Sequence, residues 1–129
     1  QMIPPTSRRV AAHIGRSYTD DILYDPEGNI QFGAWYIGHL LKKFKAQIPL
    51  GAGSFNAGPR AMMRWLDKNG DRPLDVFIEL CPYRETREYM KKLLDIYARY
   101  VWLWDKQDYL PSLQIDRKYL TPAEDGIDY

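Results

Sequence analysis

The middle of the chain reads IPLGAGSFNAGP from Ile48 to Pro59. Its first eight residues are apolar nearly all round, which is typical of a helix buried inside a helical domain, although a buried strand has the same signature. The small residues Gly51, Ala52 and Gly53 favour a helix that packs tightly against its neighbours. The segment therefore predicts an all-α domain arranged around this helix.

The region before this segment carries a strong start signal for another helix. Asp25, Pro26 and Glu27 supply an N-cap acid, a proline at the first helical position and an acid in the first turn. Apolar residues then recur at helical spacing, namely Ile30, Ala34, Ile37, Leu41 and Phe44. Gly33 and Gly38 are predicted to let a neighbouring element approach this helix closely.

The N-terminal region predicts one short helix. Thr6 or Ser7 can cap it, and it is expected to end near Ile14 and Gly15. Residues 17–24 are predicted to form a loop.

Three more helices are predicted after the central segment. Pro59 opens one that ends at Asn69-Gly70, and a short one covers about 74–80. The longest periodic segment follows Pro82 and runs to about Trp104, with apolar residues at three- and four-residue steps. After Trp104 the apolar residues no longer recur at helical spacing. We therefore predict one domain over residues 1–104 and a surface tail over residues 105–129.

The composition of the chain argues against several classes of partner and site. The 129 residues hold 18 basic and 17 acidic side chains, a near-neutral balance that argues against nucleic-acid partners. No apolar run approaches the roughly 20 residues of a membrane span. The single cysteine, Cys81, is predicted to be a small packed residue, and His13 and His39 stand alone in the sequence. We therefore expect no metal site and no cofactor.

Three motifs in order carry a family resemblance: QMIPPT at 1–6, SFNAGP at 54–59 and PYRETREY at 82–89. Over residues 1–104 the chain resembles the catalytic domain of the soluble lytic murein transglycosylases, the SLT type, which has a lysozyme-like fold. In that family the catalytic glutamate lies upstream of a Gly-Leu-Met-Gln turn, and this chain begins at the glutamine of that turn. The resemblance thus implies an N-terminally truncated domain with no catalytic residue of its own, the acid being expected upstream of Gln1.

The resemblance also implies a reaction. One glutamate protonates the leaving oxygen of the β-1,4 bond between MurNAc and GlcNAc in peptidoglycan. It then takes the proton from the C6 hydroxyl of the muramic acid, which closes a 1,6-anhydro ring. Such an acid needs apolar, enclosed surroundings to hold its proton. The implied partners are peptidoglycan glycan strands in the bacterial periplasm or cell envelope, and this chain alone is expected to be inactive.

The substrate-binding residues that the resemblance implies are Gln1, Ile3, Phe55, Asn56, Ala57, Glu85 and Tyr89. From chemistry alone, Asn56 could satisfy local backbone groups where its helix breaks, but the family's Ala-Tyr-Asn-Ala-Gly motif lines the saccharide groove. Phe55 replaces the usual tyrosine of that motif, which removes a hydroxyl.

Glu85 and Tyr89 lie four residues apart and so share one helix face. A glutamate in a first turn commonly interacts with the helix dipole, whereas the family's Glu-Thr-x-x-Tyr pattern faces the active site. Arg84 and Arg87 also match the motif and could hold peptide-stem carboxylates or be solvated. Several aromatic residues could stack on sugars but are predicted to be core, namely Trp35, Tyr36, Trp65, Tyr97, Trp102 and Trp104.

Three interpretations remain at this point. The favoured one is a lytic transglycosylase fragment that keeps most of the saccharide groove. The others are a non-catalytic peptidoglycan-binding or structural domain, and a glycosidase that uses Glu85 or Glu27. If the first helix of the family is missing, apolar surface should be uncovered on the remaining helices, and we expect a homo-oligomer that covers it.

Overall fold

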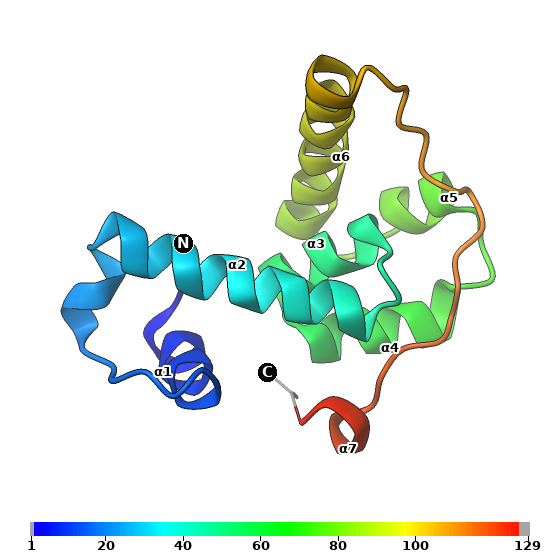
Figure 1. Cartoon of the computed structure of the whole chain (residues 1–129). Helices are drawn as coiled ribbons and strands as arrows, with labels where there is room; N and C mark the ends of the chain where they lie inside the picture. The colour runs from blue at the N-terminus through cyan, green and yellow to red at the C-terminus, as the bar shows by residue number, and fades with distance from the viewer. Residues whose placement is uncertain (1, 127–129) are drawn as a thin grey trace.

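The computed structural model describes residues 2–126, and within that range every regular element is helical. The elements are α1 (Pro4–His13), η1 (Asp20–Leu23), α2 (Pro26–Lys43), α3 (Ile48–Ala57), α4 (Pro59–Asn69), α5 (Leu74–Glu79), α6 (Arg84–Asp105) and α7 (Pro122–Asp125). Helix α3 lies at the centre and contacts α2, α4 and α6 (Figure 1). The prediction of an all-α domain around the 48–59 segment is therefore confirmed.

The glycines of α3 explain how three helices can pack on one short helix. A Cβ atom at Gly51 would lie 2.7 Å from the side chain of Leu41 in α2. At Gly53 it would clash with the terminal methyl of Met62 in α4 and lie 2.9 Å from the sulfur of Met90 in α6. Tight packing at these positions was predicted correctly.

The same expectation was wrong for the glycines of α2. No atom would lie within 4 Å of a Cβ built at Gly33 or Gly38, so neither position serves a close helix contact. The start of this helix agrees with the prediction, because the Asp25 carboxylate accepts a hydrogen bond of 2.8 Å from the backbone N–H of Gly28.

The first helix begins earlier than predicted. Ile3 is its N-cap residue and Pro4 its first helical residue, whereas neither Thr6 nor Ser7 caps it. Ser7 instead lies inside the helix and is fully buried. The predicted 17–24 loop also contains the short 3₁₀ turn η1.

The apolar core has two parts. One joins α1, η1 and α2 through residues that include Val10, Ile22 and Phe32. The other joins α3, α4, α5 and α6 and includes Cys81, which is buried as predicted. Burial raises the pKa of the Cys81 thiol, so this cysteine is a packing residue at neutral pH.

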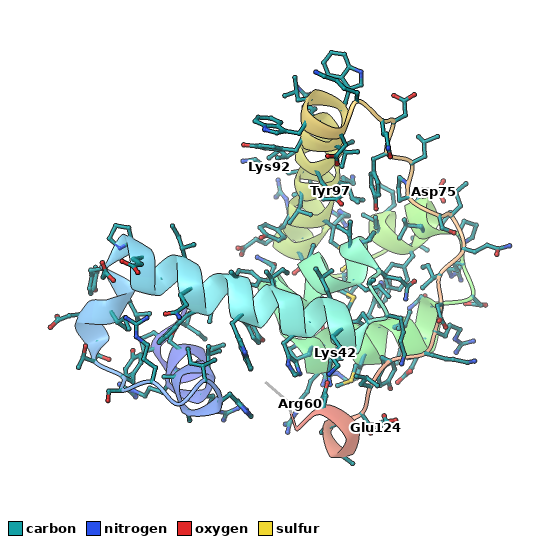
Figure 2. The ribbon with its side chains drawn as sticks, in the orientation of Figure 1. Lys42, Arg60, Asp75, Lys92, Tyr97 and Glu124 are labelled. Carbon is teal, nitrogen blue, oxygen red and sulfur yellow. The ribbon has the colours of Figure 1, made fainter. Side chains whose placement is uncertain are left out.

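Helix α6 is packed at its start and exposed at its end. Thr86 and Met90 are buried, whereas the Trp104 side chain is 70% exposed. Figure 2 shows the side chains of the distal half of α6 standing away from the other helices. The prediction that Tyr97, Trp102 and Trp104 are core residues is wrong, because they remain 39%, 59% and 70% exposed where α6 continues past α3.

After α6 the chain returns across the molecule (Figure 1). The backbone N–H of Leu74 donates to the carbonyl of Leu113 over 2.9 Å, and the side-chain amide of Gln47 pairs with both backbone groups of Asp116. The return ends at α7, where Asp125 accepts a 2.5 Å contact from the buried Lys43 ammonium. This segment, residues 106–126, is called the strap below.

Within residues 2–126 no helix is both long enough and apolar enough to cross a membrane.

Candidate functional site

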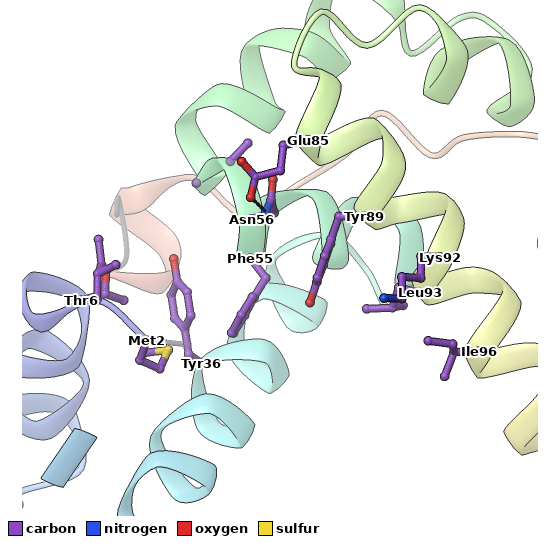
Figure 3. Close-up of a pocket in the computed structure, with 13 residues that line it drawn as sticks. Met2, Thr6, Tyr36, Phe55, Asn56, Glu85, Tyr89, Lys92, Leu93 and Ile96 are labelled. Atoms are coloured by element: carbon purple, nitrogen blue, oxygen red, sulfur yellow. Dashed lines mark hydrogen bonds between the residues drawn. The ribbon is translucent and has the colours of Figure 1, made fainter. Parts of the chain in front are cut away.

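A groove of about 920 Å³ lies where α1, α2, α3 and α6 meet (Figure 3). Its lining consists of Met2, Ile3, Thr6, Tyr36, Phe55, Asn56, Ala57, Gly58, Glu85, Tyr89, Lys92, Leu93 and Ile96. The end of α3 forms its floor and α6 forms one wall, so residues far apart in the sequence share one surface.

Asn56 is positioned by the way α3 ends. Gly58 has a φ of 86°, a conformation that glycine adopts readily, and it allows the chain to turn directly into Pro59 of α4. Asn56 thus lies in the last turn of α3, beside the first turn of α6. Its side chain therefore faces α6 instead of capping α3.

Two hydrogen bonds hold the Asn56 amide. The Thr86 hydroxyl donates to Oδ1 of Asn56 over 2.6 Å, and Nδ2 of Asn56 donates to Oε1 of Glu85 over 3.3 Å. Thr86 is buried, Asn56 is half-buried and Glu85 is exposed, so the network leads from the core to the groove. One N–H of Asn56 and three lone pairs of the Glu85 carboxylate remain for a ligand.

Aromatic rings line the same groove. The rings of Tyr36 and Phe55 lie 5.7 Å apart at a 46° tilt, and Tyr89 faces them from α6 (Figure 3). Burial raises the pKa of the Tyr89 phenol, which therefore keeps its proton at neutral pH. Although Phe55 has no hydroxyl, the lining contains two phenols, those of Tyr36 and Tyr89.

Six of the seven residues predicted for the site come together in this groove: Ile3, Phe55, Asn56, Ala57, Glu85 and Tyr89. The seventh, Gln1, lies outside the described residues. Arg84 and Arg87 do not line the groove. The Arg87 guanidinium donates instead to the backbone carbonyl of Cys81 over 3.2 Å, and so it fixes the chain after α5.

Sequence reasoning missed the other lining residues. Lys92, Leu93 and Ile96 lie three, four and seven residues after Tyr89, so helical periodicity alone would have placed them on the same face. Tyr36 was predicted to be core, and it is buried while also lining the groove. Met2 and Thr6 belong to the QMIPPT motif, but neither of them was assigned to the site from the sequence.

Most of the groove lining is uncharged. Among its described lining residues, Glu85 is the one carboxylate and Lys92 the one cation, and the remainder are aromatic, aliphatic, thioether, amide or hydroxyl groups. Glu27 lies in the first turn of α2 and does not line it. A mechanism with two carboxylates therefore has no pair among these residues. No group of three potential metal ligands occurs within residues 2–126.

The histidines differ in their surroundings. His13 and His39 both stack on Trp35, with their ring centroids 5.5 and 5.3 Å from that of Trp35. His39 is not isolated in space, because its Nε2 lies 3.7 Å from Asp125 of the strap. Neither histidine lines the groove.

Comparisons with known proteins agree on one family. The family model described as "Transglycosylase SLT domain" matches residues 1–78. The soluble lytic murein transglycosylase of Escherichia coli K12 is 34% identical over 100 residues, which cover 75% of this chain and 15% of that protein. The protein of the same name from Salmonella typhimurium is 31% identical over 100 residues, with the same coverage.

A solved structure shares the fold. It is the X-ray structure of an inactive mutant of the lytic transglycosylase Slt from Pseudomonas aeruginosa, in which a glutamate is replaced by glutamine. The TM-score is 0.74 at 27% sequence identity, over 93% of this chain and 19% of that chain. The chain thus spans less than a fifth of the length of these relatives. Its helical fold is lysozyme-like, and the chain belongs to the transglycosylase SLT domain family.

Proposed function

We propose that this chain supplies the saccharide groove of a lytic murein transglycosylase, which cleaves the MurNAc-GlcNAc β-1,4 bond of peptidoglycan and forms 1,6-anhydro-MurNAc. The observation that carries the proposal is the network of Thr86, Asn56 and Glu85 at the floor of a groove lined by aromatic rings. Membership of the SLT family supports the same substrate class.

The groove can bind a glycan in two ways. The rings of Phe55 and Tyr89 offer flat apolar surfaces to the faces of pyranose rings. The free N–H of Asn56 and the Glu85 carboxylate can bond hydroxyl and acetamido groups at the ring edges. Because Thr86 fixes the amide beforehand, little side-chain entropy is lost when the ligand binds.

Glu85 is assigned to binding and not to proton transfer. The general acid of this reaction has apolar, enclosed surroundings, whereas Glu85 is exposed in the first turn of α6 and already accepts a hydrogen bond from Asn56. We assign the acid to a glutamate that precedes Gln1 in the parent protein. The inactivity of the Pseudomonas relative with a glutamate-to-glutamine change agrees with a single essential glutamate in such enzymes.

We also propose a cellular location and a mode of self-association for this chain. A peptidoglycan substrate implies action in the bacterial periplasm or cell envelope. The exposed apolar side chains of the distal half of α6 are Ile96, Tyr97, Tyr100, Trp102, Leu103 and Trp104, and they offer a surface for self-association. Light scattering after size-exclusion chromatography tests this part, and a monomer at all concentrations would contradict it.

Digestion of purified peptidoglycan tests the reaction. One sample contains this chain and the other a version extended upstream through the Glu-Ser and Gly-Leu-Met-Gln segment of the family, and mass spectrometry detects 1,6-anhydro-muropeptides. We expect them from the extended version alone. Anhydro products from this chain would show that a residue within it is the acid, and products from neither would favour a non-catalytic binding domain.

A further inference from the structure

Lys92 is the one cationic side chain among the described residues that line the groove. It lies on α6, and Figure 3 shows it beside Leu93 on the wall that also carries Tyr89. Its side chain is exposed, so the ammonium reaches solvent in the groove without a desolvation cost.

The acids that could neutralise Lys92 within its own helix are paired with other cations. Glu88, four residues earlier, contacts Arg87 at 3.5 Å and Lys91 at 4.0 Å. Asp95, three residues later, contacts Arg99 at 3.0 Å. Among residues 2–126 the structure records no ion pair or hydrogen bond for Lys92, so a positive charge remains available in the groove.

The position of Lys92 divides the groove into two chemically different ends. Lys92 follows Glu85 by seven residues, which is about 10 Å along the helix axis. Near Glu85 the lining is an amide, a carboxylate and aromatic rings, the groups that suit neutral sugars. Near Lys92 it is a cation flanked by the aliphatic side chains of Leu93 and Ile96.

An anion with small apolar groups beside it fits this second end. In peptidoglycan the sugars themselves are uncharged, and the negative charge lies on the lactyl-linked peptide stem, where carboxylates alternate with alanyl methyl groups. A carboxylate near an unpaired ammonium gains a charge-assisted hydrogen bond, which is about twice as strong as a neutral one. The methyl groups can pack on Leu93 and Ile96.

We propose that Lys92 binds a carboxylate on the peptide-stem side of the muramic acid and so makes the groove prefer stem-bearing strands over uncharged glycans. This inference rests on the proposed function, because it assumes that glycan strands bind in this groove. Lys92 is thereby a specificity residue and takes no part in bond cleavage.

Calorimetric titration of the chain with three probes tests the inference. The probes are a stem-bearing murein tetrasaccharide, the same sugar after amidase removal of the stems, which leaves the lactyl carboxylate, and chitotetraose, which has no carboxylate. Lys92→Gln is expected to weaken binding of the stem-bearing probe about five- to tenfold, which is the typical net effect of losing one hydrogen bond at an exposed side chain. Binding of chitotetraose should stay unchanged, and Lys92→Arg should restore most of the affinity.

Lys91→Gln is the matched control, because Lys91 is adjacent on α6 but pairs with Glu79 and does not line the groove. It should leave all three affinities unchanged. If Lys92→Gln weakens the stripped sugar as strongly as the stem-bearing one, the preference for stem-bearing strands is overturned, because the lactyl carboxyl is free only in the stripped sugar and forms an amide in the stem-bearing one. Equal loss for all three probes, or no loss for any, would overturn the role of Lys92, whereas a wild-type chain that binds none of the probes would refute the proposed function itself.

Discussion

The Thr86 hydroxyl donates a 2.6 Å hydrogen bond to the side-chain oxygen of Asn56 and thereby fixes which way the Asn56 amide points. A carboxylate only accepts hydrogen bonds, so the amide nitrogen must face Glu85 and the oxygen must face Thr86. Thr86 is only 2% exposed, whereas Asn56 lines the groove. A buried core residue therefore orients a ligand-facing one.

Thr86→Val should uncouple this pair, because it replaces the hydroxyl by a methyl group and keeps the branched shape of the side chain. The oxygen of Asn56 would lose its partner, and we expect the free energy of unfolding to fall by about 1–2 kcal/mol. Glycan affinity should also fall, because the amide could rotate. Urea unfolding and calorimetry measure the two effects. Thr19→Val is the control, because Thr19 is exposed and its side chain makes no cap hydrogen bond. Equal changes in unfolding free energy and in glycan affinity for the two variants would refute the idea that Thr86 orients Asn56.

Gly53→Ala should destabilise the centre of the fold. The new methyl would meet the ends of the Met62 and Met90 side chains, both fully buried, and we expect a loss of about 1–3 kcal/mol in urea unfolding. Gly33→Ala is the matched helical control, because its methyl would meet nothing within 4 Å. It should stabilise the protein by about 0.5–1 kcal/mol. Destabilisation of the same size by both variants would contradict the packing described for α3.

Lys43→Met should weaken the attachment of the strap. Lys43 and Asp125 form an ion pair in which the two side chains are 0% and 1% exposed, so removing the lysine takes its ammonium away from a buried carboxylate. We expect a loss of about 3–5 kcal/mol in chemical unfolding. The double variant Lys43→Met/Asp125→Leu should recover much of it, because no charge is then buried. A double variant less stable than Lys43→Met would show that the pair is not coupled in this way.

His39 should make stability fall on the acid side of neutrality. Burial lowers the pKa of His39, against the opposing effect of Asp125, while Lys43, Lys42 and His13 lower it further. Its pKa in the folded state is thus below the unfolded value of about 6.5, so the unfolded chain takes up the proton first. Stability should be independent of this residue above about pH 6.5 and decrease as the pH falls below it.

Urea unfolding of His39→Gln between pH 7.5 and 5.5 measures this contribution. The variant should show a flatter decline than the wild type over the acid part of this range. His13→Gln is a second test, because His13 helps to lower the pKa of His39, and its removal should make the decline smaller without abolishing it. A decline in His39→Gln as steep as in the wild type would exclude His39 as its source.

Local signals in the sequence predicted the elements that depend on local chemistry. Asp25-Pro26 marked the start of α2, and the Gly51–Gly53 pattern marked the helix on which the others pack. The family motifs brought Asn56, Glu85 and Tyr89 to one groove, as the structure has them. Their role in binding saccharides stays a prediction, as does the division of the chain at residue 104.

Most of the errors concern tertiary context, and the exception is the start of α1, where the local signal of Pro4 at the first helical position was overlooked. The periodicity of α6 is the same over its buried and exposed halves, so no local signal showed that it runs past its partners and leaves Trp104 in solvent. The contact between Lys43 and Asp125 joins residues 82 positions apart, which no spacing rule detects. Gly33 and Gly38 looked like Gly51 in sequence, but only the last faces another helix.

The most direct test of the account is backbone-amide NMR of the chain during titration with a stem-bearing murein tetrasaccharide. We predict saturable shift changes concentrated at residues 55–58 and 85–96. Asn56→Ala should lower the affinity fitted to these changes at least about tenfold. Asn69→Ala, which removes a side chain that donates a hydrogen bond within α4, should leave the affinity unchanged. Shift changes concentrated on another surface, or none at millimolar sugar, would contradict the assignment of this groove to the glycan.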